Sequence, residues 1–153
     1  MNLHEPIDRL HKEHTLTKEE FITLIKERNE ESASYLASLA REEAVNIYGN
    51  GVFPRGLVEF TNYCKNNCYY CGIQGSNPNA NRYRLSKEEI LSACENGYQL
   101  GYRSFVLQGG EDPHYTDEVM VPIVAEIRKR YPDCAITLSL GERSKESYQK
   151  LYD

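Results

Sequence analysis

The sequence has no long apolar run and no concentration of positive charge. A membrane-spanning helix needs about 18 or more apolar residues in succession, and no such stretch occurs. The first 20 residues are polar and charged, without the apolar centre of a secretory signal. The formal net charge is -5, and no run of lysine and arginine is long enough to follow a phosphate backbone. We therefore expect a cytoplasmic protein that binds neither nucleic acid nor membrane.

Internal repeats and low-complexity tracts are also missing. The chain has 153 residues, of which 40% are hydrophobic and 27% charged, and this composition is typical of one globular domain or part of one. Cysteine is scarce, at five in the chain, yet Cys64, Cys68 and Cys71 fall within eight residues. Clustered thiols in a reducing cytoplasm are more often metal ligands or redox groups than disulfides.

The first fifty residues have a helical pattern. Thr17 and Glu20 have the spacing of a capping box ahead of an apolar stretch, and a second periodic stretch runs from Tyr35 to Ile47. The segment "YGNGVFPRG" then interrupts the periodicity with three glycines and a proline. We expect two amphipathic helices in an N-terminal segment, residues 1–50, and a different architecture in residues 51–153.

After residue 50, extended apolar stretches alternate with helical ones. The stretches "GLVEF", "SFVLQ" and "AITLSL" are typical of buried strands, and helices are expected to begin near Ser86, Thr116 and Ser144. This order predicts an α/β fold with parallel strands and right-handed crossovers. A closed (β/α)8 barrel takes roughly 250 residues, so we expect only its N-terminal portion, the first three β/α units.

Three loops follow the expected strands at their carboxyl ends. The first holds the cysteines, the second holds Gly109, Gly110 and Glu111, and the third holds Gly141 and Glu142. Ligands of parallel α/β folds bind at this edge, so the sequence predicts one composite site.

The chemistry of three close thiols leaves two alternatives open. A structural zinc site normally takes four ligands. Cys94 is expected in the core of a helix and Cys134 at a strand start, which leaves His114 as a possible fourth zinc ligand. Three thiolates also suit an iron–sulfur cluster in which one iron lacks a protein ligand and can bind a substrate. A catalytic cluster and a non-catalytic zinc module are both compatible with the loop.

The cysteine pattern resembles that of the radical S-adenosylmethionine (SAM) superfamily. The resemblance rests on Cys64-x3-Cys68-x2-Cys71, with Tyr70 before the last cysteine, at the end of the first strand of a β/α pattern. It implies a TIM-type barrel in which the three cysteines hold a [4Fe-4S] cluster and backbone at Tyr70 meets the adenine of SAM. It also implies reductive cleavage of SAM to methionine and a 5′-deoxyadenosyl radical.

The turn "QGGEDP" adds a second likeness to this superfamily. It resembles the Gly-Gly-Glu-Pro signature, which implies that Gly109, Gly110 and Glu111 bind the ammonium group of SAM; Asp112 is interposed before the proline. Glycines allow close backbone approach, and a carboxylate matches the ammonium charge. The neighbouring His114 and Tyr115 stand beside the acidic turn, where they could touch substrate, but surface loop residues of this kind are usually solvated, and we expect that here.

Within the superfamily, four segments together resemble the [FeFe]-hydrogenase maturases of the HydE type. They are "EFTNYCKNNCYYCGI", "NRYRLSKEEI", "FVLQGGEDP" and "TLSLGE". The resemblance implies that Ser139 and Glu142 contact SAM, and that Gln108 faces the barrel interior. It also implies a small-molecule or iron-complex substrate and an electron donor such as a flavodoxin or ferredoxin. Methylornithine synthase and biotin synthase are the alternative relatives, and the sequence assigns no catalytic residue.

Overall fold

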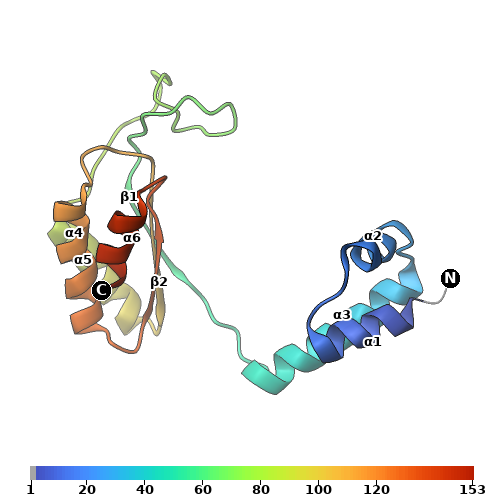
Figure 1. Ribbon diagram of the computed structural model, residues 1–153. Helices are drawn as coiled ribbons and strands as arrows, with labels where there is room; N and C mark the ends of the chain where they lie inside the picture. The colour runs from blue at the N-terminus through green and yellow to red at the C-terminus, as the bar shows by residue number, and fades with distance from the viewer. Residues whose placement is uncertain (1–2) are drawn as a thin grey trace. The chain divides into compact units, whose positions relative to one another are not determined.

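The computed structural model describes residues 3–153 and begins with three helices (Figure 1). They are α1 (His4–Glu13), α2 (Lys18–Lys26) and α3 (Glu30–Tyr48). The two helices predicted from the sequence are α2 and α3, and the Thr17 capping box of α2 is present. Helix α1 was not predicted, because its N-terminus has no side-chain cap. Burial of Leu3 and Ile7 and a 2.9 Å contact between His11 Nε2 and Glu43 hold it in the helical unit.

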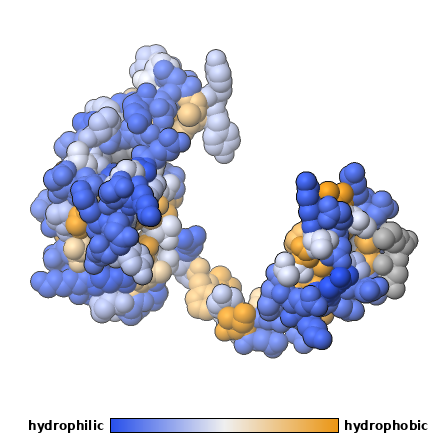
Figure 2. Space-filling model, viewed as in Figure 1, coloured by the Kyte–Doolittle hydropathy of each residue, from blue (hydrophilic) through white to orange (hydrophobic). Residues whose placement is uncertain are grey.

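The chain divides into two compact units, of which the first ends at Val52 and the second begins at Phe53. The first unit keeps several large apolar side chains on its surface, and Figure 2 shows such orange patches within a mostly hydrophilic face. They include Phe21, Ile22, Ile25, Val45 and Ile47. No helix within residues 3–153 has both the length and the apolar character that crossing a membrane requires.

The second unit is built on a parallel three-stranded sheet in the order β1-β2-β3. Its strands are β1 (Gly56–Thr61), β2 (Ser104–Gly109) and β3 (Ala135–Ser139). Each strand is followed by a helix: α4 (Lys87–Gln99), α5 (Asp117–Arg130) and α6 (Lys145–Tyr152). Ser86 and Ser144 cap α4 and α6 through their side chains, because each hydroxyl accepts from a backbone N–H three residues on. The predicted β/α alternation is confirmed.

One face of the sheet packs against the helices and forms the core. The inward side chains of β1 and β2 meet the apolar faces of α4 and α5, and the buried set comprises Val58, Phe60, Phe105, Leu107, Ile90, Leu91, Cys94, Met120, Ile123 and Ile127. Burying each large apolar side chain contributes roughly 1.5–3 kcal/mol, so this layer is the main source of stability. Cys94 is fully buried in it, as predicted. Burial raises the pKa of the Cys94 thiol to about 11.

The opposite face of the sheet carries two rows of side chains set by the strand register. Leu57, Val106 and Thr137 are paired across the strands in the first row. Glu59, Gln108 and Ser139 are paired in the second row, one step closer to the carboxyl ends. All three residues of the second row are exposed. In a barrel this is the interior face, and layers of side chains from neighbouring strands are what fill it.

Candidate functional site

The cysteine loop, residues 62–84, leaves β1 and returns to the same strand. An isolated antiparallel bridge joins Thr61 to Arg84, and Leu85 N donates to Phe60 O at 2.8 Å. Both ends of the loop are therefore fixed at the carboxyl end of β1. In Figure 1 the loop, coloured green, extends beyond the ends of the strands.

Arg82 fixes the inside of this loop. Its guanidinium donates to four backbone carbonyl oxygens, those of Asn62, Ile73, Gln74 and Asn77. The bonds to Ile73 O and Gln74 O measure 2.8 and 2.6 Å. A loop of this length has few backbone partners of its own, and the half-buried guanidinium of Arg82 satisfies several carbonyls at once.

The three loop thiols are free, and their exposure differs. Cys64 and Cys71 are half-buried, Cys68 is exposed, and a turn joins the last two through a 3.2 Å bond from Cys71 N to Cys68 O. Tyr70 is fully exposed beside them. Within residues 3–153 no three Cys, His, Asp or Glu side chains are gathered as a formed metal site. The donor set nevertheless fits a cluster, because three free thiols in one loop are the ligands that an iron–sulfur centre takes.

The turn after β2 packs directly on the cysteine loop. A Cβ atom added at Gly110 would overlap Tyr63 O and lie 2.9 Å from the Cβ of Cys64. Two backbone hydrogen bonds also hold the turn in place. Lys65 N in the cysteine loop donates to Glu111 O at 3.0 Å, and Gly110 N donates to Thr61 O at the end of β1 at 3.4 Å. Glycine is therefore required at 110 by the close approach, and the structure brings Gly109, Gly110 and Glu111 to the cysteine loop.

Glu111 reaches from this turn towards the third loop. Its carboxylate lies 3.1 Å from Lys65 Nζ, and its Cδ would lie 2.8 Å from a Cβ added at Gly141. Glu142 and Arg143 join Lys65 and Glu111 around a pocket of about 230 Å³. Ser139 lies elsewhere, on the open face of the sheet beside Gln108.

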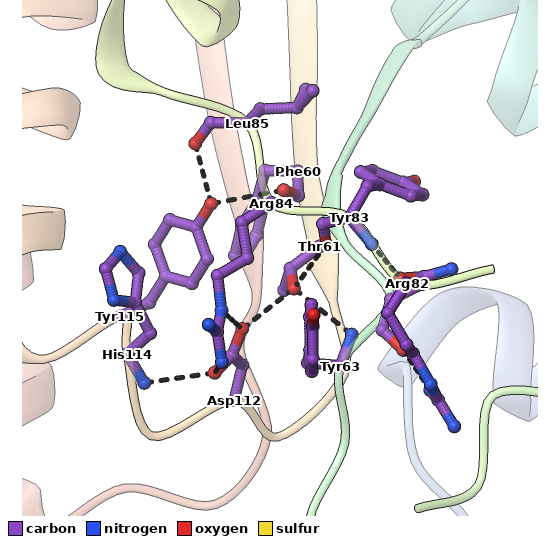
Figure 3. Close-up of polar contacts among 11 residues, drawn as sticks. Phe60, Thr61, Tyr63, Arg82, Tyr83, Arg84, Leu85, Asp112, His114 and Tyr115 are labelled. Atoms are coloured by element: carbon purple, nitrogen blue, oxygen red, sulfur yellow. Dashed lines mark hydrogen bonds and ion pairs between the residues drawn. The ribbon is translucent and has the colours of Figure 1, made fainter. Parts of the chain in front are cut away.

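Asp112 occupies the centre of a polar network that the sequence did not reveal (Figure 3). Its carboxylate accepts from Arg84 Nε at 2.7 Å, from Arg84 Nη2 and Thr61 Oγ1 at 2.8 Å, and from His114 N at 3.0 Å. The side chain is only 1% exposed. Burial raises the pKa of Asp112, but the hydrogen bonds from Arg84, His114 N and Thr61 outweigh it, so the pKa lies below its ordinary value.

Tyr115 extends the network into the core, and its predicted solvation is wrong. The ring is buried edge-on against Phe60, with centroids 4.6 Å apart. Its hydroxyl lies 2.7 Å from Leu85 O and 3.2 Å from Phe60 O, the backbone on either side of the cysteine loop. Burial raises the pKa of this phenol. His114 is exposed as predicted, with its ring set against Tyr115.

The chain has relatives of known sequence and structure. Residues 58–151 match the family model described as the Radical SAM superfamily. The chain belongs to the radical SAM superfamily. Members of this superfamily are enzymes.

Among the curated radical SAM relatives is the [FeFe] hydrogenase maturase subunit HydE of Thermotoga maritima, 44% identical over 115 residues. The 3-methylornithine synthase of Methanosarcina barkeri is 34% identical over 111 residues. These matches cover 75% and 72% of this chain and 32% and 31% of the relatives, so the chain spans about a third of their length.

Solved structures agree with the barrel assignment. A crystal structure of methylornithine synthase matches 96% of this chain and 44% of its own, with a TM-score of 0.75 and 29% identity. The hydrogenase maturase HydG matches 98% of this chain and 34% of its own, with a TM-score of 0.81 and 25% identity. The predicted fold, part of a radical SAM barrel, is confirmed.

Proposed function

We propose that this chain is the cluster-binding and SAM-binding part of a radical SAM enzyme that acts in [FeFe]-hydrogenase maturation. The observation that carries the proposal is the close packing of the Gly109–Glu111 turn on the loop of the three cysteines. Two adjoining sites of this kind can hold a cluster and a molecule that binds its open iron. The 44% identity to a HydE protein supports the maturase assignment.

In this proposal the cysteine loop and the turn have separate tasks. Cys64, Cys68 and Cys71 hold a [4Fe-4S] cluster, which when bound supplies the electron that cleaves SAM to methionine and a 5′-deoxyadenosyl radical. Gly109 and Gly110 let backbone carbonyls approach the ammonium group of SAM, and Glu111 balances its charge. The 3.1 Å contact with Lys65 holds the Glu111 carboxylate beside the pocket that both residues line.

The remaining contacts of SAM are assigned to exposed residues of the cysteine loop, of the end of β3 and of the loop that follows β3. Backbone at Tyr70 meets the adenine, while Ser139 and Glu142 contact SAM from the end of β3 and the following loop. Gln108, beside Ser139 on the open face of the sheet, faces the substrate.

The proposal also covers organisation and partners. Residues 51–153 supply the first three β/α units of the barrel, and residues 1–50 form a separate helical segment. The enzyme works in the cytoplasm on a small-molecule or iron-complex substrate and receives electrons from a flavodoxin or ferredoxin. Methylornithine synthesis is a second candidate, favoured by the 34% identity to that synthase. A biotin synthase-like reaction and a non-catalytic zinc module remain further alternatives.

Anaerobic reconstitution with iron and sulfide tests the cluster. We expect about four irons and four sulfides per chain, and a change in the EPR spectrum of the reduced cluster when SAM is added. Cys68→Ala removes one thiolate and abolishes the cluster. Cys94→Ala is the matched control, because its thiol is buried in the core, and it retains the cluster.

Two outcomes contradict the proposal. A chain that holds stoichiometric zinc and refuses iron and sulfide is a zinc module. Loss of the cluster in both cysteine variants means that the ligand assignment is wrong. Two parallel assays distinguish the candidate reactions. In one the protein is supplied to apo-hydrogenase, and in the other 3-methylornithine is sought by mass spectrometry.

A further inference from the structure

One carboxylate joins the two halves of the proposed site. Asp112 lies on the turn that carries Glu111, and it accepts from Thr61 at the start of the cysteine loop and from Arg84 at its end. Arg84 donates through both Nε and Nη2, and the fourth hydrogen bond, from His114 N, fixes the turn itself. All four bonds lie between 2.7 and 3.0 Å, and the carboxylate is almost completely shielded from water.

The same network reaches the first thiol through Tyr63. The Arg84 guanidinium lies 4.0 Å above the Tyr63 ring, and Tyr63 N donates to Thr61 Oγ1 at 3.2 Å. Tyr63 directly precedes Cys64, and its carbonyl is the group that excludes a Cβ at Gly110. A shift of Asp112 or Arg84 therefore moves the backbone at both Cys64 and Gly110.

We propose that Asp112 and Arg84 are positioning residues that set the cysteine loop and the Gly109–Glu111 turn at one fixed separation. The inference rests on the proposed function, and it assigns neither residue a contact with the cluster or SAM. The methionine part of SAM has to contact both the turn and the cluster. The distance between the turn and the cysteine loop therefore decides how well the two contacts form together. A bidentate fork on a buried carboxylate holds such a separation more rigidly than a single bond does.

Separate consequences follow for cluster assembly and for SAM binding. Without the Asp112–Arg84 pair, the three thiols and the turn are still present, so iron and sulfide still bind. The cysteine loop and the Gly109–Glu111 turn are no longer held at one fixed separation, and SAM affinity falls. Loss of the groups that orient a metal site typically lowers metal affinity or activity by about 10- to 100-fold. Because Asp112 and Arg84 orient the loop and the turn and not the thiols themselves, we expect the loss, at least about 10-fold, in SAM affinity.

The test compares variants of the reconstituted protein in a SAM titration. Asp112→Asn keeps the shape and loses the charge, and Arg84→Lys keeps the charge and loses the fork. Asp133→Asn is the matched control, because Asp133 pairs with Arg103 at 2.9 Å at the other end of the sheet. Iron and sulfide content is measured first, and the SAM-induced change in the EPR spectrum of the reduced cluster gives the affinity.

The expected result is wild-type cluster content in all three variants and weakened SAM binding only in Asp112→Asn and Arg84→Lys. Thr61→Val keeps the side-chain shape but removes the hydrogen bonds of Thr61 Oγ1 with Asp112, Tyr63 N and Tyr83 O, so it should weaken SAM binding as well. It keeps the test informative if Asp112→Asn does not fold. Wild-type SAM affinity in Arg84→Lys and Thr61→Val overturns the inference. Failure of the wild-type protein to assemble a cluster refutes the proposed function instead.

Discussion

The two ends of the sheet contain the same three residue types in different surroundings. At the carboxyl ends of the strands Arg84 pairs with Asp112 and lies 4.0 Å above Tyr63. At the amino ends Arg103 pairs with Asp133 and lies 4.0 Å above Tyr98. The Asp112 side chain is 1% exposed, whereas the Asp133 side chain is 49% exposed.

The difference between the two Arg–Asp–Tyr groups follows from what each end of the sheet has to hold. At the amino ends, a connection of a few residues joins α4 to β2, and an exposed ion pair there contributes about 0–1 kcal/mol. At the carboxyl ends, a loop of more than twenty residues has to be held against a glycine turn. A buried, fully hydrogen-bonded carboxylate does this because shifting Arg84 leaves its charge without an ion pair, and shifting Thr61 or His114 leaves it without a hydrogen bond.

The largest expected difference is in thiol reactivity, between the cysteine loop at the carboxyl ends of the strands and the buried core. In the cluster-free protein, Cys64, Cys68 and Cys71 lie in the loop, while Cys94 is fully buried and its pKa is raised by burial to about 11. A rise of about two pKa units lowers the thiolate fraction by about 100-fold, and burial slows the reagent further. We expect iodoacetamide to label three thiols quickly and Cys94 and Cys134 only after unfolding in urea. Mass spectrometry of timed samples measures this; rapid labelling of Cys94 in the folded chain contradicts it.

Truncating the two arginines should give the next largest contrast. Arg84→Ala leaves the buried Asp112 carboxylate without its ion pair, and we expect the larger loss in the free energy of unfolding here, although the Arg84 side chain itself is 38% exposed. Arg103→Ala removes an exposed pair and should cost less than about 1 kcal/mol. Urea unfolding followed by circular dichroism measures both. Equal losses would mean that the carboxylate of Asp112 is hydrated in solution and that the two ends do not differ.

Much of the fold could be predicted from the sequence because its signals are local. The spacings Thr17–Glu20 and Ser86–Glu89 are those of capping boxes, and both boxes are present. The apolar strands bounded by glycine were also recognised, since the pattern of a buried parallel strand is continuous along the chain. Helix α1 lacks a cap, so only its tertiary packing identifies it.

The network around Asp112 could not be predicted in the same way. Asp112 and Arg84 are 28 residues apart, and Asp112 and Thr61 are 51 apart, so no local pattern connects them. The sequence indicated the thiols and the glycine turn, whose residue types are unusual. It did not indicate Arg82, whose partners are backbone carbonyls and therefore leave no trace in residue type.

Glycine substitutions at the two ends should differ in kind as well as in size. Gly110→Ala places a methyl group against Tyr63 O and Cys64, and such overpacking should cost about 2 kcal/mol and displace the cysteine loop. Gly101 follows α4 with φ 93° and open space around it, so Gly101→Ala strains only the backbone, by about 1 kcal/mol. We expect a weaker SAM response in the reconstituted Gly110 variant alone. An unchanged response in both variants would show that the turn tolerates a shift.

The smallest expected effect is a dependence of stability on pH that is specific to Asp112. Because the folded protein lowers the pKa of this carboxyl, its ionised form is favoured by folding, and its contribution to stability is present at pH values above the ordinary Asp pKa. That contribution disappears as pH falls through the lowered pKa, since the protonated carboxyl no longer pairs with Arg84. The difference in free energy of unfolding between the wild type and Asp112→Asn should therefore be about 1 kcal/mol at pH 7 and shrink below about pH 4. The other carboxyl groups titrate in both proteins and cancel in this difference. Thermal unfolding at a series of pH values measures it, with Asp133→Asn run in parallel at the amino ends of the strands. A difference that stays constant down to pH 2 would mean that the charge of Asp112 contributes nothing, and that only the shape of its side chain holds the turn on the cysteine loop.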